Sequence, residues 1–330
     1  MWFHNETHQN LDIIQQCKIH KPSTIYINTD TEWFWGIDKE QVDELYDAGV
    51  ENIYIIFSSY NCEFYKNYYE PRGIPTANLI FWPTFWFNWA ERLLVGNNNL
   101  YKTQTYNNFL YPFISLNNKS HNHRCAMIDM IAKYNLLDSG KVTWNKTPHP
   151  NLNYNFRYFD NGFRGLSDDF VNKLDSFLIC QEQHQSFLHV IGEATTDVPF
   201  ITEKTVIPIL YKKPFITIAD KNFSSYLRNL GFELFDEIID YSYDSLENLE
   251  DRADAMIKNI LPLLKEDYNK LYQKLLPKLE HNYNRAWQII KDINYIPDII
   301  QERYESVKAI GKIEGFDGRY QIFIEQTVPN

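Results

Sequence analysis

The sequence predicts an α/β protein of two lobes, with a long α-helical segment toward the C-terminus. Three observations support this prediction. Short runs of β-branched and aromatic residues alternate with helical patterns, and this alternation restarts once, near residue 108. The chain has 330 residues, too many for one ordinary core. We therefore expect one α/β lobe at 1–108 and a second at 109–330, with a cleft between them.

The first lobe is predicted to begin with a βαβ unit. The runs TIYIN (24–28) and NIYIIFSS (52–59) are typical of buried strands. The segment between them has helical spacing, a capping residue at Asp38 and a terminating glycine at Gly49. A third strand is expected at 78–83 and an aromatic helix at 84–94, which together predict a small parallel sheet covered by helices.

The second lobe repeats this alternation. A strand at 112–117 leads through a polar loop to a helix at 123–137. The apolar residues of that helix recur at helical spacing and are expected to form its buried face: Met127, Met130, Ile131 and Tyr134. Further elements are expected as strands at 141–145, 187–193 and 214–219, helices at 167–178, 202–212 and 223–230, a helical region from Leu246 to Lys308, and a terminal strand at 318–330.

Composition limits the possible ligands. With 32 basic and 43 acidic residues the net charge is −11, which argues against a surface devoted to nucleic acid or to anionic membranes and leaves room for one local basic cleft. Any anionic ligand must then be held by a few placed cations. The four cysteines, Cys17, Cys62, Cys125 and Cys180, show no CxxC spacing, so neither a zinc site nor a disulfide framework is indicated.

The chain is expected to be cytoplasmic, without membrane insertion. Its first residues lack a basic segment followed by an apolar core, so they do not form a secretory signal. The most apolar run, at 78–95, is interrupted by a proline and by three polar or charged residues: Pro83, Asn88, Glu91 and Arg92. A reducing compartment also agrees with the scattered cysteines.

The segment PFITEKTVIPILYKKPFI (199–216) places a glutamate and a lysine at the start of a predicted helix. Thr202 can cap this helix, which leaves main-chain N–H groups facing a ligand. The helix dipole, these donors and Lys204 would all attract a phosphate, while Glu203 is suited to accept hydrogen bonds from ribose hydroxyls. The alternative is an ordinary first-turn acid beside an exposed lysine.

Other candidate residues lie near predicted strand ends. Arg124, in the first turn of the helix after 112–117, could hold a diphosphate through two hydrogen bonds or could be structural. His121 and His123 could assist it, although two histidines without a third ligand do not predict a metal site. Glu193 ends a strand and could bind ligand hydroxyls or cap the adjacent loop.

A catalytic base is expected in the first lobe. Asp30 and Glu32 follow the strand at 24–28 and could face the second lobe, or they could be surface acids. The chain has no GxxxxGK[ST], GxGxxG, GxSxG or HExxH motif, which excludes the commoner triphosphatase, dehydrogenase, hydrolase and zinc-protease classes. We expect no metal and no cofactor, so a leaving diphosphate would be neutralised by Arg124 and Lys204.

The string GEATTDVPFITEK (192–204) resembles the donor-site motif of the α1,3-fucosyltransferase family. Glu193 and Glu203 are ten positions apart, as in that motif, and NHRCAMIDMI is similar to the family's arginine-containing helix start. The resemblance implies a GT-B-like fold of two Rossmann-like lobes, with a nucleotide-sugar donor in the second lobe and the acceptor on the first. It implies that Arg124 and Lys204 hold the diphosphate and Glu203 the ribose.

The chain departs from the family pattern at several positions. Phe200 stands where the family usually has tyrosine, and Ala194 replaces the usual asparagine. The stretch TDTEW is similar to the family's Gly-Glu-Asn turn only at Glu32, which the resemblance implies as the base, with Asp30 next. The segment at 212–244 is similar to one in phage-encoded glycosyltransferase-like proteins, so the resemblance implies a phage-type relative in a host cytoplasm.

The sequence therefore predicts an inverting, metal-independent glycosyltransferase with a nucleotide-sugar donor, a GDP-sugar by preference. Its acceptor would be a glycan hydroxyl, or alternatively a hydroxymethylated base of phage DNA. A third possibility is a nucleotide- or glycan-binding protein without catalysis. Four tryptophans could stack on an acceptor or belong to the core: Trp33, Trp35, Trp82 and Trp86.

Overall fold

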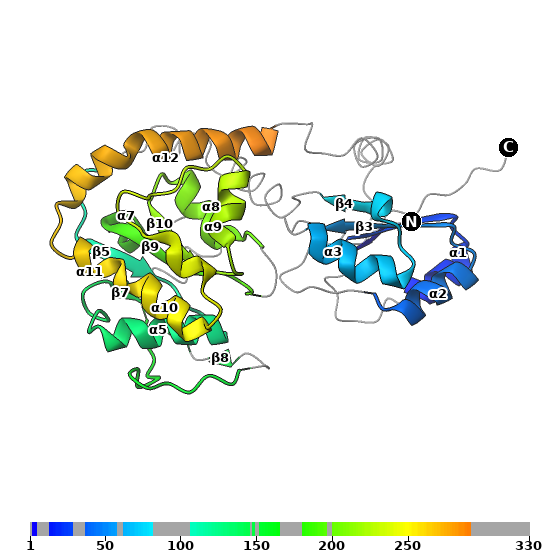
Figure 1. Ribbon diagram of the computed structural model, residues 1–330, viewed down its shortest axis with the longest axis horizontal. Helices are drawn as coiled ribbons and strands as arrows, with labels where there is room; N and C mark the ends of the chain where they lie inside the picture. The colour runs from blue at the N-terminus through cyan, green and yellow to red at the C-terminus, as the bar shows by residue number, and fades with distance from the viewer. Residues whose placement is uncertain are drawn as a thin grey trace. The chain divides into compact units, whose positions relative to one another are not determined.

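The computed structural model describes residues 2–4, 13–28, 37–57, 62–81, 106–145, 147–148, 152–165, 180–196 and 200–291. The chain divides into two compact units, and each contains a four-stranded sheet whose strands are all parallel (Figure 1). The predicted α/β class is confirmed. The expected boundary near residue 108 adjoins residues 82–105, which lie outside the described part, and stays a prediction.

The first unit is a sheet in which chain order and spatial order agree, β1-β2-β3-β4. Its strands are β1 (Trp2–His4), β2 (Thr24–Asn28), β3 (Asn52–Phe57) and β4 (Leu79–Phe81). Its helices are α1 (Ile13–His20), α2 (Lys39–Asp47) and α3 (Cys62–Tyr69), followed by the short 3₁₀ turns η1 (Glu70–Arg72) and η2 (Thr76–Asn78).

The local signals of the first unit act as predicted. Asp38 caps α2 in a capping box, since its carboxylate accepts from Gln41 N at 2.8 Å and its own N–H donates to the Gln41 side chain at 3.0 Å. Gly49 follows the helix with a φ of 94°, a conformation that favours glycine. Ile25, Ile27 and Ile53 point to the face of the sheet that packs against α1, α2 and α3.

The second unit contains the sheet that positions the candidate site. Its order is β10-β9-β5-β7, formed by β5 (Tyr111–Ser115), β7 (Lys141–Val142), β9 (Ser186–Gly192) and β10 (Phe215–Ile218). A separate parallel pair joins β6 (Lys119–Ser120) to β8 (Thr147–Pro148). The helices are α5 (Asn122–Lys133), α7 (Gln181–Gln185), α8 (Glu203–Leu210), α9 (Phe223–Asn229), α10 (Leu249–Lys258), α11 (Ile260–Leu263) and α12 (Tyr268–Lys291), with a 3₁₀ segment η3 (Tyr241–Ser245).

Helices cover both faces of this second sheet. In Figure 1, α5 and α10 lie below it and α8 and α12 above it, and α5 packs on α10 as α8 packs on α12. All seven residues of β9 are buried, which explains its nearly continuous apolar run. The prediction that α5 has a single buried face is wrong, because every residue from 123 to 131 is buried. Tyr134 is only half-buried and donates its hydroxyl to Asp254 at 2.8 Å.

The predicted C-terminal helical region consists of three helices through Lys291. α10 and α11 meet at Asn259, and a short turn separates α11 from α12, so the apolar spacing continues across two breaks. Four expected elements lie outside the described residues: the helices at 84–94 and 167–178, the helical end at 292–308, and the terminal strand at 318–330.

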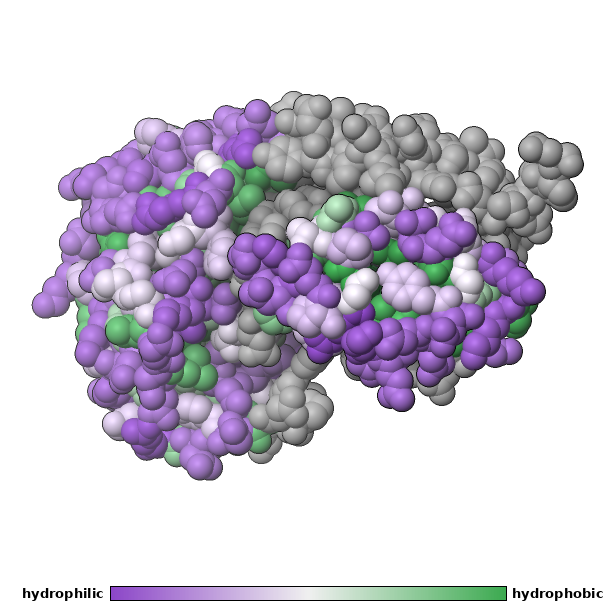
Figure 2. Space-filling view, turned by 45° about the vertical axis from the view of Figure 1, so that its right-hand side comes forward, coloured by the Kyte–Doolittle hydropathy of each residue, from purple (hydrophilic) through white to green (hydrophobic). Residues whose placement is uncertain are grey.

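Among the described helices, none combines the length and the apolar character needed to cross a lipid bilayer. Among the coloured residues in Figure 2, hydrophilic ones cover most of the surface that is seen, and hydrophobic ones form smaller areas between them. The large apolar side chains that are most exposed, Phe163 and Ile19, belong to different units. Single exposed side chains of this kind are normal on protein surfaces.

Candidate functional site at a topological switch point

The order of the second sheet places a topological switch point between β5 and β9. The chain leaves β5 through α5 and reaches β7 on one side, whereas it leaves β9 through α8 and reaches β10 on the other side. The two crossovers therefore diverge from neighbouring strands. In open α/β sheets such a switch point, outside the carboxyl ends of the strands, is where ligands bind. The strands of the first unit run in sequential order and have no such reversal among their described members.

α8 begins at this switch point with the predicted cap. Thr202 has extended backbone geometry, and its hydroxyl accepts from Lys204 N at 3.3 Å. Lys204 Nζ lies 2.8 Å from Glu203 Oε1, and the two side chains are 24% and 22% exposed. The second carboxylate oxygen of Glu203 is buried and has no hydrogen-bond partner within the described residues. The start of α8 thus has a partly exposed ammonium group next to a buried carboxylate oxygen that has no partner within the described residues.

Glu193 lies directly after β9 and is fully buried. Its carboxylate accepts from Thr202 N at 3.2 Å and from the hydroxyls of Thr202 and Thr205. It also accepts from Ala194 N at 3.2 Å. Burial raises the pKa of Glu193, while the charge of Lys204 and the threonine hydroxyls act in the opposite direction. Its contacts fit the alternative role given above: the carboxylate caps the loop and fastens the start of α8.

Arg124 occupies the first turn of α5 and is 4% exposed. Its Nε donates to the carbonyl of Gly192 at 3.0 Å, and its Nη2 donates to the carbonyl of Glu193 at 2.8 Å. Its Nη1 reaches the carbonyl of Lys119 at 3.5 Å. These contacts make the guanidinium a tie between α5 and the end of β9. Binding of a diphosphate by Arg124 stays a prediction.

His123 also connects α5 to the end of β9, a role that the sequence did not indicate. Its Nε2 lies 2.6 Å from the carbonyl of Glu193, and because a carbonyl only accepts, that nitrogen carries the proton. Burial lowers the pKa of His123 well below its ordinary value, and the charges of Arg124 and Lys204 lower it further. The starts of α5 and α8 are joined through Glu193, whose carbonyl bonds to α5 and whose carboxylate bonds to α8.

The remaining predicted residues divide into two groups. Phe200 is 5% exposed and belongs to the packed interior just before α8. His121 precedes α5, and its ring centroid lies 5.5 Å from that of His123. Six others lie outside the described residues: Asp30, Glu32, Trp33, Trp35, Trp82 and Trp86. The predicted base and the predicted stacking surface therefore stay predictions.

In the part of the chain that the structure describes, no group of three or more histidine, cysteine, aspartate or glutamate side chains has a metal-binding arrangement. The three cysteines with described side chains, Cys17, Cys125 and Cys180, are free and buried, and burial raises the pKa of each thiol. None of these thiols is suited to act as a nucleophile or ligand.

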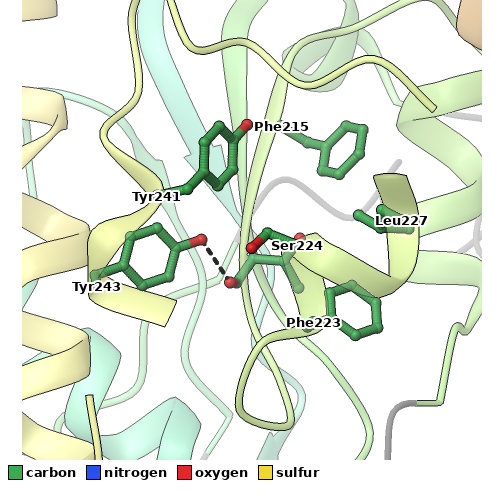
Figure 3. Close-up of a pocket in the computed structure, with 7 residues that line it drawn as sticks. Phe215, Phe223, Ser224, Leu227, Tyr241 and Tyr243 are labelled. Carbon is green, nitrogen blue, oxygen red and sulfur yellow. Dashed lines mark hydrogen bonds between the residues drawn. The ribbon is translucent and has the colours of Figure 1, made fainter. Parts of the chain in front are cut away.

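A small hollow lies at the outer edge of the same sheet. It is lined mainly by rings from β10, α9 and η3, and Tyr243 donates its hydroxyl to the carbonyl of Thr217 at 2.8 Å (Figure 3). This contact covers the free edge of β10. The hollow is mostly apolar and shares no residue with the cluster at the switch point. It is best explained as part of the packing around the sheet edge.

Comparison with known proteins yields no relative: no family model, no curated protein and no solved structure matches this chain. Function is therefore inferred from the geometry of the switch point and from the motif resemblance given above. The geometry supplies a partly exposed ion pair at a helix start, supported by a buried network of hydrogen bonds.

Proposed function

We propose that the protein is a glycosyltransferase that moves a sugar from a nucleotide-sugar donor, a GDP-sugar by preference, to an acceptor hydroxyl. One observation carries the proposal: the partly exposed pair of Lys204 and Glu203 begins α8 at the switch point of a parallel sheet. The dipole at a helix start favours anions, and the ammonium adds a full positive charge. A diphosphate fits this combination better than an uncharged ligand does.

The two residues of the pair have different proposed roles. Lys204 would leave Glu203 Oε1, now 2.8 Å away, and neutralise the charge that develops on the departing diphosphate. Glu203 would accept from ribose hydroxyls through Oε2, the oxygen that has no partner within the described residues. A carboxylate that keeps one unused buried oxygen has a reason to bind a donor of hydrogen bonds.

The proposed reaction is an inverting displacement in which the lobes of a GT-B-like protein close over both substrates. The acceptor oxygen forms a bond to the anomeric carbon while the bond from that carbon to the diphosphate breaks. The acceptor proton passes to a carboxylate, Glu32 by preference and Asp30 next. The electron pair of the broken bond leaves with the nucleoside diphosphate, whose charge is stabilised at α8.

Nucleotide-dependent thermal stabilisation tests the proposal at low cost. Among GDP-, UDP- and CMP-sugars, at least one should raise the melting temperature, because a ligand of the native state at 100 times its Kd adds about 2.7 kcal/mol of stability. Glu203→Ala and Lys204→Ala should each remove the shift. Lys258→Ala is the matched control, since Lys258 is also ion-paired, to Asp254 at 2.7 Å, but lies on α10. If both α8 variants keep the full shift, the donor site is wrong.

A second candidate is a nucleotide-binding protein without catalysis, because the groups at the start of α8 are suited to binding an anion. The two candidates differ in turnover. A transferase should release the nucleotide of the stabilising donor, GDP, UDP or CMP, when glycan acceptors, or DNA with hydroxymethylated bases, are supplied. Stabilisation without release from any acceptor would favour the binding protein.

A further inference from the structure

The carbonyl of Glu193 receives two donors from the first turn of α5. His123 Nε2 lies at 2.6 Å and Arg124 Nη2 at 2.8 Å from the same oxygen. Gly192, the last residue of β9, receives Arg124 Nε on its own carbonyl at 3.0 Å. The end of β9 is therefore held from the α5 side by three hydrogen bonds.

The side chain of Glu193 continues this connection toward α8. Its carboxylate holds the main chain and hydroxyl of Thr202, which caps α8, and the hydroxyl of Thr205 in the first turn. One residue thus joins the two helix starts, with α5 bound to its carbonyl and α8 bound to its carboxylate. A shift of the Glu193 main chain would be passed to the turn that contains Lys204.

Both α5 side chains are almost completely buried, since His123 is 3% and Arg124 4% exposed. By contrast, the Lys204 side chain is 24% exposed. The neutral, Nε2-protonated form of His123 donates a hydrogen bond without adding a third positive charge beside Arg124 and Lys204. Because His123 is neutral, the positive charge that attracts an anion comes from the partly exposed Lys204.

We propose that His123 is a positioning residue of the nucleotide site: it fixes the end of β9, and through Glu193 it fixes the start of α8 in the geometry that binds the ligand. This inference rests on the proposed function for its ligand, but the mechanical part concerns the protein alone. The close approach of α5 supports it, because a Cβ at Gly192 would lie only 2.6 Å from Arg124 Cγ. The contact between α5 and the end of β9 is close enough that a small displacement of one moves the other.

Two variants separate the hydrogen bond from the volume of the ring. His123→Gln keeps an N–H donor at similar reach, and His123→Leu keeps similar volume without a donor. In hydrogen-deuterium exchange, His123→Leu should speed exchange of the amides at 203–206 about fivefold, the loss expected for one hydrogen bond. His123→Gln should change it less than about twofold, and amides of α12 should be unaffected in both variants.

Binding of GDP is the second measurement on these variants. His123→Leu should weaken GDP binding about fivefold in the parent chain and should add nothing in a Lys204→Ala background, because the contact it positions is then absent. His123→Gln should bind GDP like the parent. If His123→Leu does not fold, His123→Asn, whose side chain is too short to reach the carbonyl, replaces it.

The outcomes distinguish the inference from the proposed function. Unchanged exchange at 203–206 in the donor-less variant overturns the positioning role, whatever binds. Faster exchange throughout α12 as well as α8 also overturns it, since His123 would then support the whole unit. If the exchange effect is confined to α8 but neither GDP nor any nucleotide sugar binds the parent, the positioning role stands and the proposed function fails.

Discussion

The two edges of the second sheet place their lysines in different surroundings. At the carboxyl edge, where α5 and α8 begin, a buried network supports a lysine that is 24% exposed. At the opposite edge, Lys213 precedes β10 and is fully buried, with Nζ donating to the carbonyls of His184 at 2.6 Å and Ser186 at 3.0 Å. The exposure and hydrogen bonds of a lysine, rather than its position beside a helix end, therefore distinguish a candidate binding group from a structural one.

Removing the buried lysine should have the largest effect on stability. Lys213→Ala leaves a cavity beside the ring of Tyr106, 3.5 Å from Nζ, and leaves two carbonyls without their donor. We expect the free energy of unfolding to fall by about 3 kcal/mol, measured by urea denaturation. Lys204→Ala should change it by less than about 0.5 kcal/mol. Equal losses in the two variants would remove the distinction between the edges.

A methyl group at the carboxyl edge should have the next largest effect. Gly192→Ala places a Cβ 2.6 Å from Arg124 Cγ, so either β9 or α5 must move. We expect a loss of about 2 kcal/mol in the free energy of unfolding, together with weaker nucleotide binding. Gly162→Ala is the matched control, because its new Cβ would meet only the flexible Asp160 side chain, at 3.1 Å. If Gly192→Ala changes neither the free energy of unfolding nor nucleotide binding, α5 and the end of β9 are not tightly packed.

The pH dependence of stability sharpens the same comparison. Burial lowers the pKa of Lys213 to about 6, whereas the pKa of a lysine in an unfolded chain is about 10.4. Between these values the unfolded chain binds more protons, so the free energy of unfolding should rise with pH, by at most about 1.4 kcal/mol per pH unit from this residue. Lys213→Met should lower the slope between pH 7 and 9. A slope that is unchanged in Lys213→Met would contradict this.

Much of the fold could be predicted because its signals are local. β-branched runs indicated β2, β3, β9 and β10, and the capping residues Asp38 and Thr202 marked the helices that they cap. The strand expected at 141–145 is present as β7, whereas β1, with three residues, is too short to show a period. The helical spacing of α5 could not reveal that a sheet and α10 enclose it, because that follows from tertiary packing.

The candidate site was predictable in its location more than in its roles. The spacing of Thr202, Glu203 and Lys204 indicated a capped helix start, and the structure has one. The sequence could not show that Arg124 bonds to main-chain carbonyls, because a guanidinium binds carbonyls and phosphates through the same N–H groups. For the same reason Glu193 offered two readings, and only its contacts with Thr202 and Thr205 identify the capping role.

A crystal structure of the protein with GDP tests the central claim most directly. The account predicts that the diphosphate lies at the start of α8, with Lys204 Nζ and at least one first-turn N–H within about 3.2 Å of phosphate oxygens. It also predicts that His123 and Arg124 keep their bonds to the carbonyls of Gly192 and Glu193. A diphosphate bound away from α8, with Lys204 still paired only to Glu203, would contradict it.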